Sequence, residues 1–186
     1  MNDNLNGIIT EVANAPIRSS IITAAALIDS MLKKLIEKKL IENLPKDIFD
    51  YSGCLGTFSA KNNMAYAMGL ISKELYDDIK LYGKIRNKCA HNFDLDRGNM
   101  QSITDNAKQF KSLKAVFQFD EKNVDVRLYT VLEFAVILVA LIKRINNVDK
   151  CEAFPFEAHS DYLKFDDYDY ELLTHFDATF KNIIQK

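Results

Sequence analysis

The chain has 186 residues and carries 24 lysines and arginines against 26 aspartates and glutamates. This length suits one domain with a sizeable core. The slightly negative net charge gives no support to broad electrostatic attraction to DNA or RNA, so any nucleic-acid contact must be local. The three cysteines, Cys54, Cys89 and Cys151, form no CxxC pair. They argue against a disulfide framework and a zinc knuckle, and they favour a reducing, cytoplasmic compartment.

The distribution of apolar residues predicts an all-α fold. The chain has only six glycines and three prolines, and no stretch shows the sustained alternation of a strand. The N-terminus lacks the basic start and long apolar run of a signal peptide. The most apolar run, residues 131–142, is shorter than the roughly 20 residues needed to cross a bilayer. We therefore expect a single-domain bundle of about five to eight helices, with no membrane segment.

Two helices are predicted in the N-terminal part of the chain. A short helix over residues 5–13 ends before Pro16, because the residue that precedes a proline is displaced from the α region. Pro16 is itself a favourable first helical residue, and from there a long helix runs to near Pro45. Its apolar residues recur on one side and its charged residues on the other, which is typical of a helix with one buried face.

A loop with Gly53 and Gly56 as hinges leads to a third predicted helix. Ser59 is the expected N-cap of this helix, which covers residues 60–69 and ends where Gly69 adopts the left-handed conformation. The loop lacks the spacing and the Lys-Ser/Thr pair of a phosphate-binding P-loop. We therefore interpret it as structural.

Residues 72–93 predict the central helix, with Ser72 as its N-cap. Acidic residues lie in its first turns and basic residues later, which suits the helix dipole. We expect it to pack antiparallel to the long helix that begins at Pro16, or to that helix in a second subunit. Its apolar residues recur every three to four positions and mark one buried face: Leu75, Ile79, Tyr82, Ile85 and Cys89.

The second half of the chain predicts two more helices. Residues 102–118 form the first, with apolar residues on one side. A turn follows around residues 120–125, and residues 126–148 form a strongly apolar helix that we expect in the core.

The C-terminal segment differs in character from the rest. Over residues 152–177, aromatic residues are interleaved with eight carboxylates and a single base, Lys164. In one interpretation the aromatic rings seal the bundle while the carboxylates stay in water. In the other, the segment is an acidic lid over a basic site, such as the helix end at residues 86–91. We expect residues 1–150 to form the bundle and residues 151–186 to form an extension packed on it.

The end of the central helix, RNKCAH, collects chemically capable side chains. On a straight helix Asn87 and His91 share a face, whereas Arg86 and His91 lie about 140° apart around the axis. Two such helices crossing at a dimer two-fold could bring Arg86 and His91 together. A histidine acting as acid or base and an arginine stabilising a phosphate would suffice for metal-independent RNA cleavage. In the structural alternative, the basic residues near the C-terminus of the helix interact favourably with the helix dipole, and His91 donates a hydrogen bond to the last free carbonyls.

No residue pattern predicts a metal or cofactor. His159 and His175 are isolated and show no ligand spacing. No Ser-His-Asp arrangement, dinucleotide fingerprint or P-loop is visible. We therefore expect a protein without a cofactor.

Several segments between Arg18 and about Ile145 resemble the mannitol operon repressor family. The resemblance is carried by GCLGTFSAKNNMAYAMGLIS (residues 53–72), by IRNKCAH (85–91) and by the apolar helix that starts near Arg127. It implies an all-helical protein that assembles with itself, lacks a recognisable DNA-binding motif and regulates transcription through other proteins. The tail after residue 150 is not part of the resemblance. The resemblance does not imply specificity for a sugar alcohol, because function depends on sites rather than folds.

A second resemblance is to the HEPN superfamily of small helical bundles. Its ribonuclease members carry an arginine, a polar residue, three more residues and a histidine, and Arg86, Asn87 and His91 match that spacing. The resemblance implies a toxin or defence ribonuclease in which His91 is the acid and base, Arg86 stabilises the phosphate and Asn87 orients His91. Our first hypothesis is nevertheless a non-enzymatic, protein-binding regulator that dimerises through the helices containing Arg18 and Ser72. The ribonuclease is the alternative.

Overall fold

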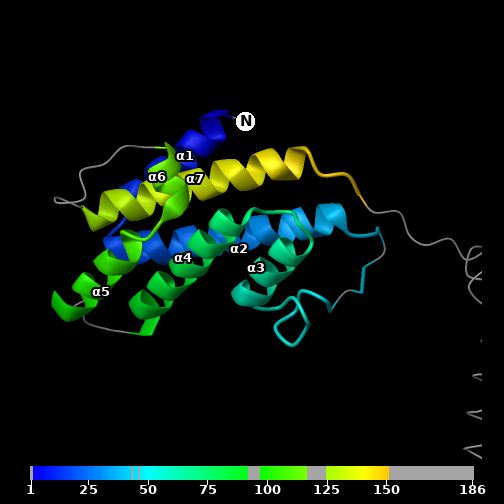
Figure 1. The fold of residues 1–186 in the computed structure, drawn as a ribbon, viewed down its shortest axis with the longest axis horizontal. Helices are drawn as coiled ribbons and strands as arrows, with labels where there is room; N and C mark the ends of the chain where they lie inside the picture. Colours follow the sequence, from blue (N-terminus) through cyan, green and yellow to red (C-terminus); the bar gives the residue numbers. More distant parts are fainter. Residues whose placement is uncertain (1, 43, 46, 92–96, 117–124, 151–186) are drawn as a thin grey trace, which may run out of the picture. The chain divides into compact units, whose positions relative to one another are not determined.

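The computed structural model describes residues 2–150 apart from 43, 46, 92–96 and 117–124. These described residues form seven helices and no strand (Figure 1), which confirms the all-α prediction. Residues 151–186, which were predicted to pack on the bundle, lie outside the described residues. No described helix is long and apolar enough to cross a membrane. The helices are α1 (Asn2–Asn14), α2 (Ile17–Lys39), α3 (Phe58–Ala67), α4 (Lys73–His91), α5 (Arg97–Ala107), α6 (Lys111–Val116) and α7 (Val126–Asn146).

Helix α2 is the central element of the bundle. Helix α7 lies along one side of it, and α3 and α4 pack against another side (Figure 1). The contact between α2 and α4 is made within one chain, and the two helices run in opposite directions, as expected. Ala24 and Ala25 of α2 are almost completely buried, because small side chains let neighbouring helices approach closely.

Aromatic residues connect α4 to the far side of the core. The rings of Tyr82 and Phe110 are stacked with centroids 6.1 Å apart, and both side chains are fully buried. The Tyr82 hydroxyl donates a hydrogen bond to the carbonyl oxygen of Thr130 on α7, at 3.3 Å. A buried tyrosine needs such a partner, because an unpaired hydroxyl in the core would be costly.

Two predicted helix ends were wrong. The long helix ends at Lys39 rather than near Pro45, since Leu40 already has an extended backbone. The N-cap of α3 is Thr57 rather than Ser59, and the Thr57 side chain accepts a hydrogen bond from the Ala60 amide at 3.1 Å. Thr57 and Ser59 both have a hydroxyl group that can cap a helix. Thr57 is the cap because its backbone is extended and the helix begins at the next residue.

The loop before α3 is fixed by Lys61. The ammonium group of this side chain lies 3.3 Å from the carbonyl oxygens of Leu55 and Gly56 and 3.1 Å from the Asp29 carboxylate of α2. Only 5% of the Lys61 side chain is exposed. The loop itself is tightly folded, because a Cβ added to Gly53 or Gly56 would lie 2.1 Å from a backbone carbonyl oxygen. The close backbone approach therefore explains why glycine stands at both positions of the loop.

Arginines of α7 fix two other connections in the same way. Arg127, at the start of α7, donates to the carbonyl oxygens of Ala13 and Ala15 at the end of α1. Arg144, near the end of α7, donates to the Leu70 carbonyl between α3 and α4 at 2.9 Å. Helix ends leave carbonyls without partners inside their own helix, and cationic donors satisfy them.

Gly69 ends α3 in the left-handed conformation, as predicted, with a φ of 65°. Its amide bonds the Tyr66 carbonyl and the Leu70 amide bonds the Ala65 carbonyl, which is the Schellman arrangement. Replacing Gly69 with alanine is expected to lower the free energy of unfolding by about 1 kcal/mol, because an L side chain is strained at positive φ. Urea denaturation measures this change.

Gly7→Ala is the matched control for that substitution. Gly7 lies inside α1, and neither glycine has an atom within 4 Å of an added methyl group. Alanine at Gly7 should therefore stabilise the protein by up to about 1 kcal/mol through helix propensity. A stabilising effect of alanine at Gly69 would contradict the assigned backbone conformation.

Candidate functional site

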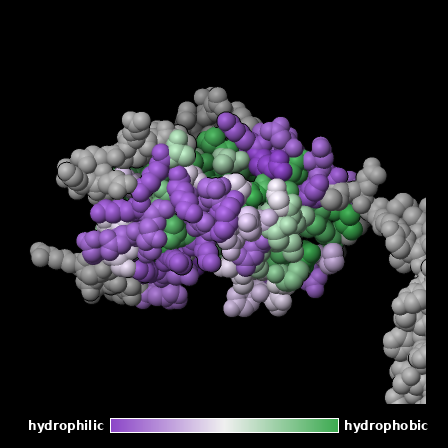
Figure 2. Space-filling view, viewed as in Figure 1, coloured by the Kyte–Doolittle hydropathy of each residue, from purple (hydrophilic) through white to green (hydrophobic). Residues whose placement is uncertain are grey.

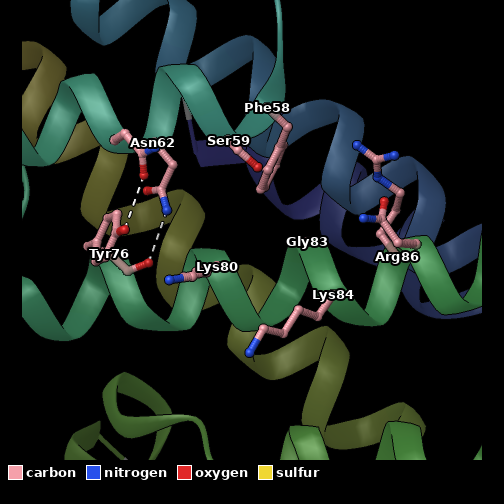
Figure 3. Close-up of a pocket in the computed structure, with 10 residues that line it drawn as sticks. Phe58, Ser59, Asn62, Tyr76, Lys80, Gly83, Lys84 and Arg86 are labelled. Carbon is pink, nitrogen blue, oxygen red and sulfur yellow. Dashed lines mark hydrogen bonds between the residues drawn. The ribbon is translucent and has the colours of Figure 1, made fainter.

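Two of the three predicted site residues, Arg86 and Asn87, line a pocket of about 290 Å³ between α3 and α4 (Figure 3). His91, the last residue of α4, is exposed and does not line it. The structure of one chain therefore does not bring Arg86 and His91 together. The catalytic pairing across a dimer stays a prediction. The other lining residues are Phe58, Ser59, Asn62, Asn63, Tyr76, Lys80, Gly83 and Lys84.

Arg86 is held against an aromatic ring. Its guanidinium carbon lies 5.8 Å from the ring centroid of Phe58, the first residue of α3. The ring can come this close because α4 carries Gly83 there, where a Cβ would lie 3.0 Å from a ring carbon of Phe58. A cation over an aromatic face is attracted by the ring quadrupole. Arg86 thus contributes to the contact between α3 and α4, whatever else it binds.

Polar contacts hold the other end of this pocket. The Asn62 side-chain amide donates to the carbonyl oxygen of Tyr76 at 3.1 Å, and the Tyr76 hydroxyl donates to Asn63 at 3.1 Å (Figure 3). The rings of Tyr66 and Tyr76 are stacked with centroids 4.8 Å apart. These contacts fix α3 on α4, so the pocket has well-defined walls.

Cys89 belongs to the core and not to the site. It lies within RNKCAH, but its side chain is fully buried, and this burial raises the pKa of the thiol. A thiol held in its protonated form is a poor nucleophile and a poor metal ligand.

A pair of buried carboxylates forms a feature that the sequence did not predict. Asp78 on α4 and Glu133 on α7 are both fully buried. Asp78 accepts hydrogen bonds from the amides of Lys111 and Ser112, at 2.9 and 2.6 Å, and Glu133 accepts one from the Leu113 amide at 3.0 Å. The carboxylates therefore cap the first turn of α6 from two other helices.

This capping corrects the single helix predicted over residues 102–118. The segment is divided into α5 and α6 by residues 108–110. The amides at the start of α6 bond to side chains of α4 and α7, where an unbroken helix would bond them to carbonyls of its own preceding turn. The apolar period alone could not reveal the break, because the capping groups lie far away in the sequence.

Burial and the neighbouring Asp78 carboxyl raise the pKa of Glu133 to about 8. Burial is the larger cause, since it disfavours the charged form. Repulsion by Asp78 acts in the same direction, and so does a hydrogen bond between the two side chains. The amide of Leu113 acts in the opposite direction, because it favours the ionised carboxylate. Near neutral pH Glu133 is therefore mostly protonated.

Replacing Glu133 with glutamine is expected to flatten the pH dependence of stability between about pH 5 and pH 8. The carboxyl has an ordinary pKa of 4.5 and a folded-state pKa of about 8. The folded state therefore binds more protons in this window, and the free energy of unfolding of the wild type falls as pH rises through it, by roughly 2 to 4 kcal/mol. Urea unfolding at several pH values measures the slope.

Glutamine preserves the shape and can still accept the hydrogen bond from Leu113, but it cannot ionise. The variant should match the wild type near pH 5 and be more stable above pH 8. An unchanged slope in the variant would show that another group causes the pH dependence.

Lysines line a second hollow, of about 530 Å³, between α4 and the α5–α6 segment. We call it the lysine groove. Figure 2 shows hydrophilic side chains gathered over α4, α5 and α6 on the face in view. This site was not predicted from the sequence, because its lysines come from two distant segments. The only local signal was the spacing of three among Lys108, Lys111 and Lys114. The lining residues are Asp77, Lys80, Leu81, Lys84, Lys108, Gln109, Lys111 and Lys114.

The protein is thus a helical bundle with two hollows, lined largely by polar residues, along α4. The family model of the mannitol repressor (MtlR) matches residues 8–149, which is most of the chain. The chain therefore belongs to the mannitol repressor family, and the predicted resemblance is confirmed. No curated protein and no solved structure matches it. The resemblance to the HEPN superfamily stays a prediction.

Proposed function

We propose that this protein regulates transcription through protein partners and does not read DNA with a motif of its own. Membership of the mannitol repressor family supports a repressor-type role. The operon and its inducer do not follow from the family name, because function depends on sites rather than folds. We further propose that the working form is a homodimer in the cytoplasm, as predicted from the sequence.

The α5–α6 segment supports the part of the proposal that concerns DNA. These helices are joined by three residues, as the two helices of a helix-turn-helix are. A recognition helix must place its N-terminal residues in the major groove. The N-terminal amides of α6 are instead bonded to the buried Asp78 and Glu133, and the described part of the helix spans six residues. Such a helix is poorly suited to reading bases.

The α3–α4 pair fits DNA no better. A short connection joins the two helices, but the surface of the first turns of α4 carries Glu74 and Asp77. Carboxylates at this end would repel the phosphates of the DNA backbone. Both candidate helix pairs thus favour a regulator that reaches DNA through another protein.

A deletion and complementation experiment in the native host tests the regulatory role. Loss of the gene should raise the transcripts of a small set of operons, and the wild-type gene should restore repression. We expect a gene encoding His91→Ala to restore it equally, because His91 is exposed and regulation requires no general acid or base. We expect His91→Ala to leave the protein folded for the same reason, which circular dichroism can check.

The ribonuclease alternative makes the opposite prediction. Purified wild-type protein would cleave a mixed RNA pool without metal, and folded His91→Ala would not. If cleavage disappears in that variant and complementation fails with it, the regulatory proposal is wrong.

A further inference from the structure

The lysine groove concentrates positive charge on a chain with a net charge of −2. Lys80 and Lys84 of α4 form one wall, and Lys108, Lys111 and Lys114 form the other. The lining includes a single carboxylate among the described residues, Asp77. This local concentration of positive charge stands out because the rest of the chain carries more acidic than basic residues.

The carboxylate in the lining already has partners. Asp77 forms ion pairs with Lys111, at 3.2 Å, and with Lys73 of the first turn of α4. The hydrogen bonds from these two lysines lower the pKa of Asp77. Asp77 therefore does not neutralise Lys80, Lys84 and Lys108, which give the groove a positive field that can attract an anion.

The groove has walls fixed by the core. Asp77 and Asp78 are neighbours on α4, but Asp77 lines the groove whereas Asp78 is buried and bonds the amides of Lys111 and Ser112. The buried carboxylate thereby holds α6, and two of its lysines, beside α4. A site whose walls are positioned before binding loses less entropy when it captures a ligand.

We propose that the lysine groove binds an acidic segment of a partner protein. This inference rests on the proposed function, because it assigns a surface to the partner-mediated regulation. Lys80 and Lys84 are one helical turn apart, a rise of about 6 Å. Alternate residues of an extended peptide are about 7 Å apart. An extended segment with a carboxylate at every second residue can therefore place one near each of these lysines.

The lining fits a peptide better than a nucleic acid. Among the residues that the structure describes, the lining contains no aromatic side chain on which bases could stack, and its one apolar member is Leu81. This described part of the lining also contains no arginine for bidentate contact with phosphate or guanine. A nucleic acid, with a phosphate on every nucleotide, would also meet the acidic excess outside the groove, whereas a short acidic segment would contact only the groove.

Fluorescence anisotropy with the full chain tests this inference. The probe is a fluorescein-labelled peptide of alternating glutamate and serine, beside the same peptide with glutamine for glutamate. The test variant is Lys84→Gln combined with Lys108→Gln. The control is Lys34→Gln combined with Lys38→Gln, which removes the same charge from exposed positions of α2. Single-stranded RNA and duplex DNA of similar length are the competing probes.

We expect the groove variant to raise the dissociation constant of the acidic peptide roughly tenfold, since two ion pairs are worth about 1 to 2 kcal/mol together. The control variant should leave it nearly unchanged, and added salt should weaken binding. Equal loss in both variants, no binding of the peptide, or tighter binding of RNA or DNA through the groove lysines would overturn the inference. None of these results requires the host, so this inference can fail while complementation still supports regulation.

Discussion

Replacing Lys61 with methionine is expected to lower the free energy of unfolding by about 2 to 4 kcal/mol. Methionine preserves most of the packing of the side-chain stem but removes the charge and its donors. The carbonyls of Leu55 and Gly56 and the carboxylate of Asp29 would then lose their cationic partner. Because the Lys61 side chain is only 5% exposed, water cannot readily replace it. Urea denaturation followed by circular dichroism measures the loss.

Two variants make this test specific. Lys34→Met places the same change on an exposed position of α2 and should leave stability nearly unchanged. Asp29→Asn added to Lys61→Met should recover part of the loss, because it removes the carboxylate left without its partner. If Lys61→Met lowers the free energy of unfolding by no more than Lys34→Met does, Lys61 does not hold the loop.

Replacing Asp78 with alanine is expected to have an effect of similar size, about 2 to 4 kcal/mol. The change leaves the buried amides of Lys111 and Ser112 without acceptors and opens a cavity beside Glu133. We expect α6 to lose order locally before the rest of the bundle unfolds. Amide hydrogen exchange at residues 111–113, together with urea denaturation, reports both effects.

Asp77→Ala is the matched control, one residue away on the same helix. Asp77 is partly exposed and its partners are surface lysines, so its loss should change stability much less. In the Asp78→Ala protein the lysine groove should also lose affinity for the acidic peptide, because α6 carries one of its walls. Unchanged exchange at residues 111–113 would contradict the assigned role of Asp78.

The main helices could be predicted because each has a complete local signal. Apolar residues with a helical period mark α2, α4 and α7, and Gly69 marks the end of α3. The break between α5 and α6 could not be predicted, since the side chains that cause it lie 33 and 20 residues from the amides they bind. Asp78 also follows Asp77 in the sequence, and two adjacent acids normally indicate a solvated surface.

The candidate sites show the same limit. The pattern of residues 86–91 indicated Arg86 and Asn87, which line a pocket. No signal in the neighbouring sequence indicated that the Phe58 ring would lie against the Arg86 guanidinium. Lys61 stood inside the family-like segment, yet its burial follows from the loop folded over it. The lysine groove forms only when α6 is brought beside α4, so it is a property of the tertiary structure.

Selection from a random pool of duplex DNA tests the central claim, that this repressor-family protein does not read DNA itself. The purified full chain is immobilised, and the bound DNA is sequenced after several rounds at physiological salt. We predict that no sequence motif is enriched above a mock selection, for the wild type and for Lys84→Gln combined with Lys108→Gln alike. A motif that is reproducibly enriched by the wild-type protein would contradict the account and place a DNA-reading surface on this chain.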